Sequence, residues 1–518
     1  MIACARSAAL IGIDACLVSV EADLSNGLPG FATVGLPQGA VREGRERVHA
    51  AIVNAGFDAP LKRITVNLAP ADIKKDGTGF DLPIAIAILA ASGQVPGAPL
   101  ESTMLVGELG LDGDLRPVRG ALCVALAARR AGFASLVLPW ENAGEAAMVG
   151  GLAVIGARTI GEVVGHLTGE SPLAAVHADP IALLRNCPPD GMDFSDVRGQ
   201  PMARRAMEVA AAGGHNILLI GPPGAGKTML ARRLPGILPQ LSLEEALDTT
   251  RIHSVAGLLP AVGALVTSRP FRAPHHTVSD AGLIGGGSTP RPGEVSLAHG
   301  GVLFLDELPE FRRHVLEVLR QPLEDATVTL SRASMSLTFP ARFMLVAAMN
   351  PCPCGYAGDA MRACRCDTLQ LQRYLSRISG PLLDRIDIQL RVPAAPPGEL
   401  LSVEGEEPSA AIRERVAEAR RRQRERFTGL PGVHANAHMG AREVRRCCRP
   451  GPEGEALIRS ALTRLHLSAR AYTRILKVGR TIADLAGADQ VGTAHIAEAI
   501  QYRTLDRGGI SESATAAE

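Results

Sequence analysis

The stretch ILLIGPPGAGKT, residues 217–228, decides the fold. An apolar run typical of a buried strand leads into a glycine-rich turn, which ends on a lysine and a threonine. The spacing fits G-x-x-x-x-G-K-[ST] in the strand–turn–helix context that a phosphate-binding loop (P-loop) requires, and the alternative is a chance glycine loop. Backbone N–H groups and the next helix N-terminus would attract phosphates. We therefore expect a triphosphate to bind at Gly221, Pro222, Pro223, Gly224, Ala225, Gly226, Lys227, Thr228 and Met229.

A second motif, GVLFLDEL at 301–308, ends an apolar strand on two carboxylates. We expect Asp306 to hold Mg²⁺ together with the hydroxyl of Thr228. Glu307 would orient and deprotonate the attacking water. The alternative is a buried strand that ends in an exposed acidic pair.

Two further segments carry polar residues suited to the same site. The strand RFMLVAAMN, 342–350, ends in Asn350, and ligands bind at the carboxyl ends of parallel strands, so this amide is expected near the γ-phosphate or the water. The segment SGPLLDRIDI, 379–388, places Arg385 after a short helix, where it could stabilise transition-state charge from a neighbouring subunit. Taken alone, Arg385 is better explained as a surface salt-bridge partner.

Composition excludes several classes of protein. The 518 residues carry a formal net charge of +1, so no global positive field draws the chain to nucleic acid or membrane. Aromatic residues are only 3%, which argues against base-stacking platforms. The 10 cysteines are too few for a disulfide scaffold. Because Asp14 interrupts the first apolar stretch and 82–100 resembles a buried helix plus loop, we expect a cytoplasmic protein with no membrane contact.

The chain divides by character into five segments. Residues 1–170 alternate short β-like runs with Ala-rich helical segments, and the Pro/Asp-rich residues 171–192 indicate a linker. In 193–395, apolar strands of the parallel type alternate with helices. Residues 396–510 show helical periodicity, and 511–518 are expected to be a disordered tail.

The four motifs follow one another in the order of the AAA+ ATPases. The segment RPFRAPHHTVSDAGLIGGGSTPRPGEVSLAHGGVLFLDELPEF (269–311) resembles the magnesium-chelatase-like AAA ATPases, in particular the YifB/ComM family, and so do NPCPCGY (350–356) and ARAYTRILKVGRTIADLAG (469–487). The resemblance implies an α/β P-loop core with a parallel sheet and an α-helical lid after it. It also implies ATP with Mg²⁺, a hexameric ring, and work on branched or single-stranded DNA during recombination and transformation.

The resemblance also assigns residue roles. Asn350 would be sensor 1, Arg385 the arginine finger and Arg470 sensor 2, with Arg474 as a competing choice. A β-hairpin inserted between the first two motifs would point to the ring centre, in a region that includes Arg272, His275, His276 and Arg291. Core or turn packing explains the two histidines equally well.

The N-terminal segment is similar to another family. Residues 74–89 and 103–140 resemble the α+β protease domain of Lon, whose nucleophilic serine aligns with Gly79 and whose lysine aligns with Val124. Neither a nucleophile nor a base remains, so we expect an assembly or partner-binding module rather than a protease. Two other functions stay open: a chelatase subunit that powers metal insertion, and a Lon-like regulator or protease.

Two features outside these motifs each leave two interpretations. Cys352, Cys354, Cys364 and Cys366 form C-x-C…C-x-C, which suits a tetrahedral Zn²⁺ site or four reduced thiols. The arginine-rich segment 411–427 could track a phosphate backbone, but a solvated helix with i,i+4 ion pairs is favoured.

Overall fold

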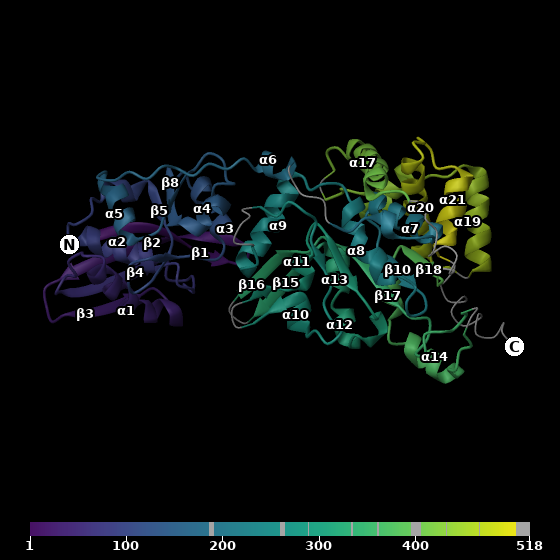
Figure 1. The fold of residues 1–518 in the computed structure, drawn as a ribbon, viewed down its shortest axis with the longest axis horizontal. Helices are drawn as coiled ribbons and strands as arrows, with labels where there is room; N and C mark the ends of the chain where they lie inside the picture. Colours follow the sequence, from purple (N-terminus) through teal and green to yellow (C-terminus); the bar gives the residue numbers. More distant parts are fainter. Residues whose placement is uncertain are drawn as a thin grey trace.

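The computed structural model describes residues 1–185, 191–259, 265–287, 290–332, 335–359, 362–394, 406–430, 432–465 and 467–503. The described residues form an N-terminal α/β region, a central α/β region and a C-terminal helical region, which follow one another along the long axis of the molecule (Figure 1). The expected tail 511–518 and the expected boundary at 395–396 lie outside the described residues.

The N-terminal region is built on a seven-stranded sheet in the order β3-β4-β2-β1-β5-β8-β9. Its β1–β2 and β2–β4 pairs are antiparallel, and the remaining pairs are parallel. Burial along β2 alternates, because one face of the sheet packs against helices. The strands are β1 (Ile2–Ile11), β2 (Asp14–Ser25), β3 (Gly30–Val34), β4 (Arg63–Ala69), β5 (Thr103–Leu105), β8 (Ser135–Pro139) and β9 (Ala153–Ala157).

Five helices and a small β-ribbon complete this region. Helix α2 is apolar on all sides and almost wholly buried, as the uniform run of Leu, Ile and Ala predicts. The helices are α1 (Gly39–Asn54), α2 (Asp81–Ala91), α3 (Ala121–Arg130), α4 (Trp140–Ala146) and α5 (Ile160–Thr168), and the ribbon is β6 (Glu108–Leu109) with β7 (Leu115–Arg116).

The central region contains a five-stranded, wholly parallel sheet in the order β11-β14-β17-β10-β18. Strands β10, β14 and β17 are buried along their whole length, which explains their continuous apolar sequence. Their carboxyl ends therefore meet at one edge of the sheet. The strands are β10 (Ile217–Ile220), β11 (Phe271–Arg272), β14 (Val302–Leu305), β17 (Met344–Met349) and β18 (Ile388–Arg391).

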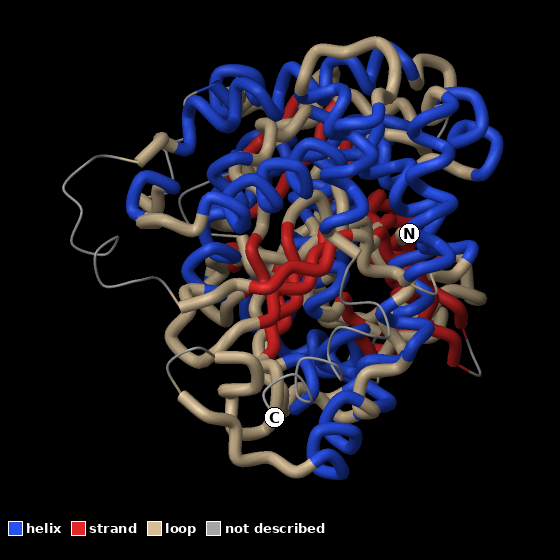
Figure 2. Tube along the Cα trace, turned by 90° about the vertical axis from the view of Figure 1, so that its right-hand side faces the viewer, coloured by secondary structure: helices blue, strands red, loops and turns tan. Residues whose placement is uncertain are grey.

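Helices and two hairpins surround this sheet, and the second view shows strands in the interior with most helices outside them (Figure 2). The helices are α7 (Pro201–Gly213), α8 (Lys227–Ile237), α9 (Leu243–Ala256), α10 (Asp280–Ile284), α11 (Glu294–Leu297), α12 (Arg313–Glu317), α13 (Arg320–Asp325), α14 (Thr368–Leu375) and α15 (Gly380–Leu383). The hairpins pair β12 (Gly285–Gly286) with β13 (Arg291–Pro292), and β15 (Thr327–Arg332) with β16 (Met335–Pro340).

The C-terminal region consists of helices that pack on the central one through a shared core. They are α17 (Ser409–Arg426), α18 (Ala441–Cys447), α19 (Pro452–Arg464), α20 (Ala469–Leu485) and α21 (Thr493–Gln501). Inside the expected linker 171–192, the structure has a short helix, α6 (Pro180–Arg185). The predicted parallel core and helical C-terminal region are thus confirmed. Among the described residues, no helix combines the length and apolar character needed to cross a bilayer.

Helix α9 joins the central region to the N-terminal one. Arg251 on α9 donates to Asp14 at 2.6 Å and to the carbonyl of Ile13 at 3.1 Å. Ser254 on the same helix donates to the buried carboxylate of Glu145. Apolar residues of both regions also share a buried cluster, so the two regions form a continuous contact.

Candidate nucleotide-binding site

The P-loop joins β10 to α8 at the carboxyl edge of the central sheet. Gly224 and Gly226 both have φ of +80°, a left-handed conformation that glycine adopts without strain. A Cβ at Gly221 would lie 2.1 Å from the carbonyl oxygen of Val392, so no side chain fits there. The turn thus brings its backbone and the α8 N-terminus to one point, which suits an anion.

Lys227 is the first residue of α8 and lies largely buried under this loop. Its Nζ donates to the carbonyl oxygens of Gly221 at 2.7 Å and Pro222 at 2.9 Å, and to Oδ1 of Asn350 at 3.1 Å. Burial lowers the pKa of Lys227, while the nearby carboxylates of Asp306 and Glu307 oppose that shift. The structure therefore brings Lys227 and Asn350 together, as the sequence predicts for a phosphate site.

The acidic pair after β14 lies next to the P-loop. Thr228 Oγ1 donates to Asp306 Oδ2 at 2.7 Å. A hydroxyl oxygen and a carboxylate oxygen thus lie side by side, and Mg²⁺ prefers oxygen ligands of these kinds. Glu307 has φ of +52° and its side chain is 57% exposed. A non-glycine residue held in this region marks a constrained position, and here the strain places the carboxylate outside the core.

His276 is the residue nearest to that carboxylate in the upstream segment. Its Nδ1 lies 3.7 Å from Oε2 of Glu307, and its ring lies 4.0 Å from that of His275. Arg272 pairs with Glu294 through two contacts of 2.6 and 2.7 Å. Of the four residues predicted around the hairpin, only Arg291 belongs to a hairpin strand, β13. The segment thus places one histidine at the candidate site and one arginine on the β12–β13 hairpin.

The three predicted arginines are not at the P-loop. Arg385 is buried in its own chain, where it pairs with Glu324 and donates to the carbonyl of Pro381 at 2.5 Å. Arg470 is 63% exposed and lies 3.3 Å from Asp384, whereas Arg474 lies 2.8 Å from the buried Asp387. Both sensor 2 candidates therefore reach the segment around Arg385. Among the described residues, no hydrogen bond or ion pair links either of them to the P-loop.

The four predicted cysteines converge directly after Asn350. All four sulfur atoms lie within 4.8 Å of one another, and the Sγ–Sγ distances from Cys352 are 3.3 Å to Cys354 and 3.6 Å to Cys364. Burial raises the pKa of Cys352 to about 12. A Cβ at Gly355, which has φ of +89°, would lie 2.7 Å from Cδ of Pro223. The cysteine loop therefore contacts the P-loop through a glycine.

The arginine-rich segment forms helix α17, and its arginines mostly contact this chain. Arg421 pairs with Glu418 and Glu425, and Arg415 pairs with Glu208 and Glu407. The other contacts run from Arg413, Arg420, Arg422 and Arg426 to carboxylates or carbonyls. This arrangement favours the ion-paired helix over a surface that tracks phosphates.

Sequence reasoning missed one residue at the P-loop and a buried network behind it. Gln200 has φ of +55°, its amide donates to the carbonyl of Ala225 at 2.8 Å, and its Oε1 is buried without a hydrogen bond. The sequence Gly199-Gln200-Pro201 before a helix is the only signal for it. In the buried network, the Nδ1 atom of His215 lies 2.9 Å from Oδ2 of Asp387. Its Nε2 atom lies 2.8 Å from Oγ1 of Thr481. These three residues belong to no common sequence motif, so the sequence did not indicate the network.

Comparisons with known proteins show which family the sequence matches. Residues 193–400 match the family described as magnesium chelatase, subunit ChlI; residues 20–142 match subunit ChlI of Mg-chelatase, and 406–503 its C-terminal part. "Uncharacterized protein YifB" of Salmonella typhimurium is 46% identical over 512 residues, 98% of each chain. "Competence protein ComM" of Haemophilus influenzae is 46% identical over 504 residues, 97% of each chain.

A more distant relative covers only part of the chain. "Lon protease 2" of Bacillus subtilis is 33% identical over 157 residues, which is 28% of this chain and 27% of that protein. The three chelatase matches and the two full-length relatives together settle the family. The chain belongs to the YifB/ComM family of magnesium-chelatase-like AAA+ proteins.

Proposed function

We propose that this chain is an ATP-hydrolysing ring motor that acts on DNA. The observation that carries the proposal is the convergence of four side chains at one edge of the central sheet. Lys227 meets Asn350 there at 3.1 Å, and Thr228 meets Asp306 at 2.7 Å. This is the charge and donor pattern that phosphoryl transfer needs.

The chain's own residues would divide the work as follows. Lys227 exchanges the carbonyls of Gly221 and Pro222 for phosphate oxygens, and the loop amides hold the rest of the phosphate chain. Thr228 and Asp306 would hold Mg²⁺, which supplies charge neutralisation when bound. Glu307 accepts a proton from the attacking water, and Asn350 orients that water.

A ring of subunits would supply each nucleotide with an arginine from the neighbouring chain. Arg385 stabilises transition-state charge only if its guanidinium leaves Glu324 and reaches the nucleotide of the next subunit, which makes a hexameric assembly part of the proposal. Arg470, with its exposed guanidinium, serves as sensor 2 in preference to Arg474, because Arg474 is already paired with the buried Asp387.

Support for DNA as the substrate comes from the relative named as a competence protein, 46% identical over 97% of each chain. We assign branch migration or helicase-type work on branched or single-stranded DNA, in the cytoplasm. The family description as magnesium chelatase supports a second candidate, an ATPase subunit that powers metal insertion.

The cysteine cluster adds a structural metal to the proposal. Four thiols within 4.8 Å of one another match the ligand number and spacing of a closed Zn²⁺ site. Zinc at Cys352, Cys354, Cys364 and Cys366 would fix the loop that contacts Pro223. This role is structural, since all four positions of a tetrahedral ion are then filled by protein.

The test is the ATPase rate of the purified full chain with linear, forked and four-way DNA, combined with the assembly mass in ATP. We expect branched DNA to stimulate turnover and to bind with a steep salt dependence. Lys227→Ala should abolish nucleotide binding, Glu307→Gln should bind ATP but hydrolyse it slowly, and Lys62→Ala, an exposed lysine remote in sequence from the site, should match the wild type. If ATP is hydrolysed but no DNA is bound at low salt, the chelatase candidate replaces the DNA motor.

A further inference from the structure

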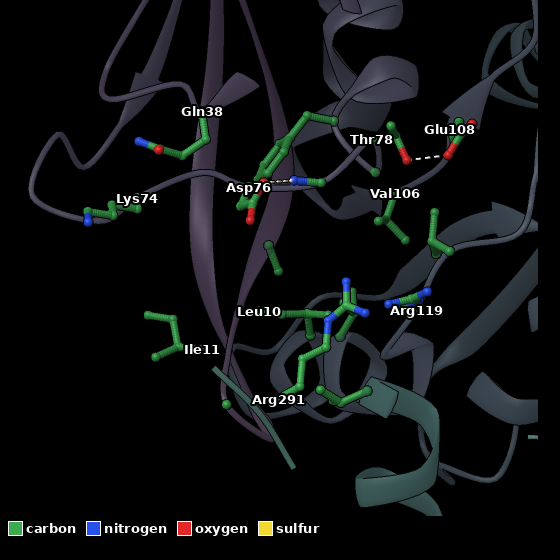
Figure 3. Close-up of a pocket in the computed structure, with 18 of the residues that line it drawn as sticks. Leu10, Ile11, Gln38, Lys74, Asp76, Thr78, Val106, Glu108, Arg119 and Arg291 are labelled. Atoms are coloured by element: carbon green, nitrogen blue, oxygen red, sulfur yellow. Dashed lines mark hydrogen bonds between the residues drawn. The ribbon is translucent and has the colours of Figure 1, made fainter. Parts of the chain in front are cut away.

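A cavity of about 1000 Å³ lies where the N-terminal region meets the central one (Figure 3). The N-terminal region supplies most of the wall, from the ends of β1 and α1, the loop before α2, and the start of α3. The central region supplies Val255, Pro290, Arg291 and Leu337. The cavity is separate from the P-loop, whose residues do not line it.

The positions that align with a protease dyad both line this cavity. Gly79 stands where the resemblance to Lon places the nucleophilic serine, and Val124 stands where it places the lysine. These two positions are 45 residues apart in sequence, and the fold brings both to the same cavity. The cavity therefore joins the two positions at which the resemblance places a nucleophile and a base, and neither group is present to cleave a bound chain.

The floor of the cavity suits a polypeptide main chain. Gly77 lines the cavity with no atom within 4 Å of its Cβ position, so another backbone can approach there, whereas Val106 and Val118 pack against Gly79. Thr78 itself donates its hydroxyl to Glu108. Apolar side chains of Leu10, Ile11, Val106, Val118 and Val124 line the remaining wall. Such a wall fits peptide side chains, and it lacks the exposed aromatic rings on which nucleobases stack.

The charges that face the cavity select for an acidic ligand. Arg119 comes from the N-terminal region and Arg291 from the β12–β13 hairpin, and Figure 3 shows both pointing into the same space. Among the described residues, no ion pair or side-chain hydrogen bond occupies either guanidinium. The wall also carries Lys74 and two acids, of which Asp76 accepts from the Gly77 amide at 2.9 Å and Glu108 accepts from Thr78, so the lining holds three cationic and two anionic side chains. Two unpaired arginines favour a carboxylate.

We propose that this cavity binds an extended acidic peptide segment of a partner protein without cleaving it, clamped between Arg119 and Arg291. Because the two arginines come from different regions, the bound segment bridges them. Arg119 also lies against the C-terminal cap of α9, where a Cβ at Gly257 would be 2.9 Å from its Nε. The proposal goes beyond the DNA motor, and its test does not depend on ATP hydrolysis.

The test uses two pools of random ten-residue peptides, one built from Glu, Asp, Val, Leu and Ala, the other with Lys and Arg in place of the acids. Each pool is dialysed against the full chain, and retained peptide is measured by mass spectrometry. We expect the acidic pool to be retained at least about tenfold over the basic pool. Arg119→Glu and Arg291→Glu should each abolish this preference. Arg130→Glu, which reverses an exposed charge on α3 outside the cavity, should keep it.

Hydrogen exchange of the full chain with the acidic pool locates the contact and checks the variants. Protection at 76–80 and 117–119, with unchanged thermal unfolding of each variant, supports the proposal. Equal retention of the two pools, retention that survives both reversals, or protection elsewhere would overturn it. Retention of a ten-nucleotide oligothymidylate through the same two arginines would assign the cavity to nucleic acid and also overturn it.

Discussion

Replacing His215 with leucine should loosen the contact between the nucleotide-binding core and the C-terminal helices. His215 is fully buried, and its ring nitrogens contact Asp387 at 2.9 Å and Thr481 at 2.8 Å. Loss of a hydrogen bond to a buried carboxylate costs about 1.5–3 kcal/mol, and loss of a neutral one about 1 kcal/mol. The Thr481 hydroxyl still donates to the carbonyl of Lys477 at 3.0 Å, so the smaller figure applies to it.

We therefore expect His215→Leu to lower the free energy of unfolding by about 3 kcal/mol, a fall in Tm of roughly 3–5 °C for a chain of this size. Differential scanning fluorimetry of the full chain measures this. His215→Asn, whose amide can replace the ring nitrogen that faces Asp387, should lose about half as much. Gly213→Ala should be at least as damaging, because its Cβ would lie 2.2 Å from the His215 ring. A Tm of His215→Leu within 1 °C of wild type (no more than about 1 kcal/mol) would refute this account of the network.

Three further predictions concern the metal, the finger and the N-terminal region. Metal analysis of freshly purified protein should find one zinc per chain, and the Cys352→Ser variant should contain much less. If the wild type contains less than about half an equivalent, the zinc assignment fails. Arg385→Ala should leave ATP binding intact in a filter assay but lower the ATPase turnover of the assembled ring about 10³-fold. Unchanged turnover would show that Arg385 does not act on the nucleotide of the next subunit. Burial raises the pKa of Asp81 to about 6 despite Arg47. A carboxyl whose pKa is raised in the folded state destabilises the fold as it ionises. Acidification from pH 7 to 5 should therefore stabilise the wild type by about 1 kcal/mol relative to Asp81→Asn. An equal pH response of the two proteins in thermal unfolding would contradict this.

The central sheet could be predicted because its strands are buried on both faces. Continuous apolar runs at 217–220, 302–305 and 344–349 leave few other structures open to those segments. The glycine pattern of the P-loop then fixes which edge of the sheet carries polar side chains. The sequence therefore predicts polar side chains near Lys227 at this edge, and in the structure its Nζ donates to Asn350 Oδ1 at 3.1 Å.

Other elements carry weaker local signals. Strand β1, Ile2–Ile11, mixes Ala, Ser and Arg with apolar residues, and its position in the sheet depends on pairing with β2 rather than on its own pattern. Helix α21, Thr493–Gln501, follows Gly492 without a side-chain cap bond, so within the expected helical region 396–510 no capping residue marks where it begins. The network of His215, Asp387 and Thr481 joins residues more than 90 positions apart, and no spacing rule connects such residues.

The contact between Gly355 and Pro223 links the four-cysteine loop to the P-loop. The four-cysteine loop packs against the P-loop, so a movement of one loop displaces the other. Because Gly355 has a φ of +89°, a larger residue would be strained at this position. If the four cysteines hold a metal, as proposed, its loss would reach the P-loop through this van der Waals contact.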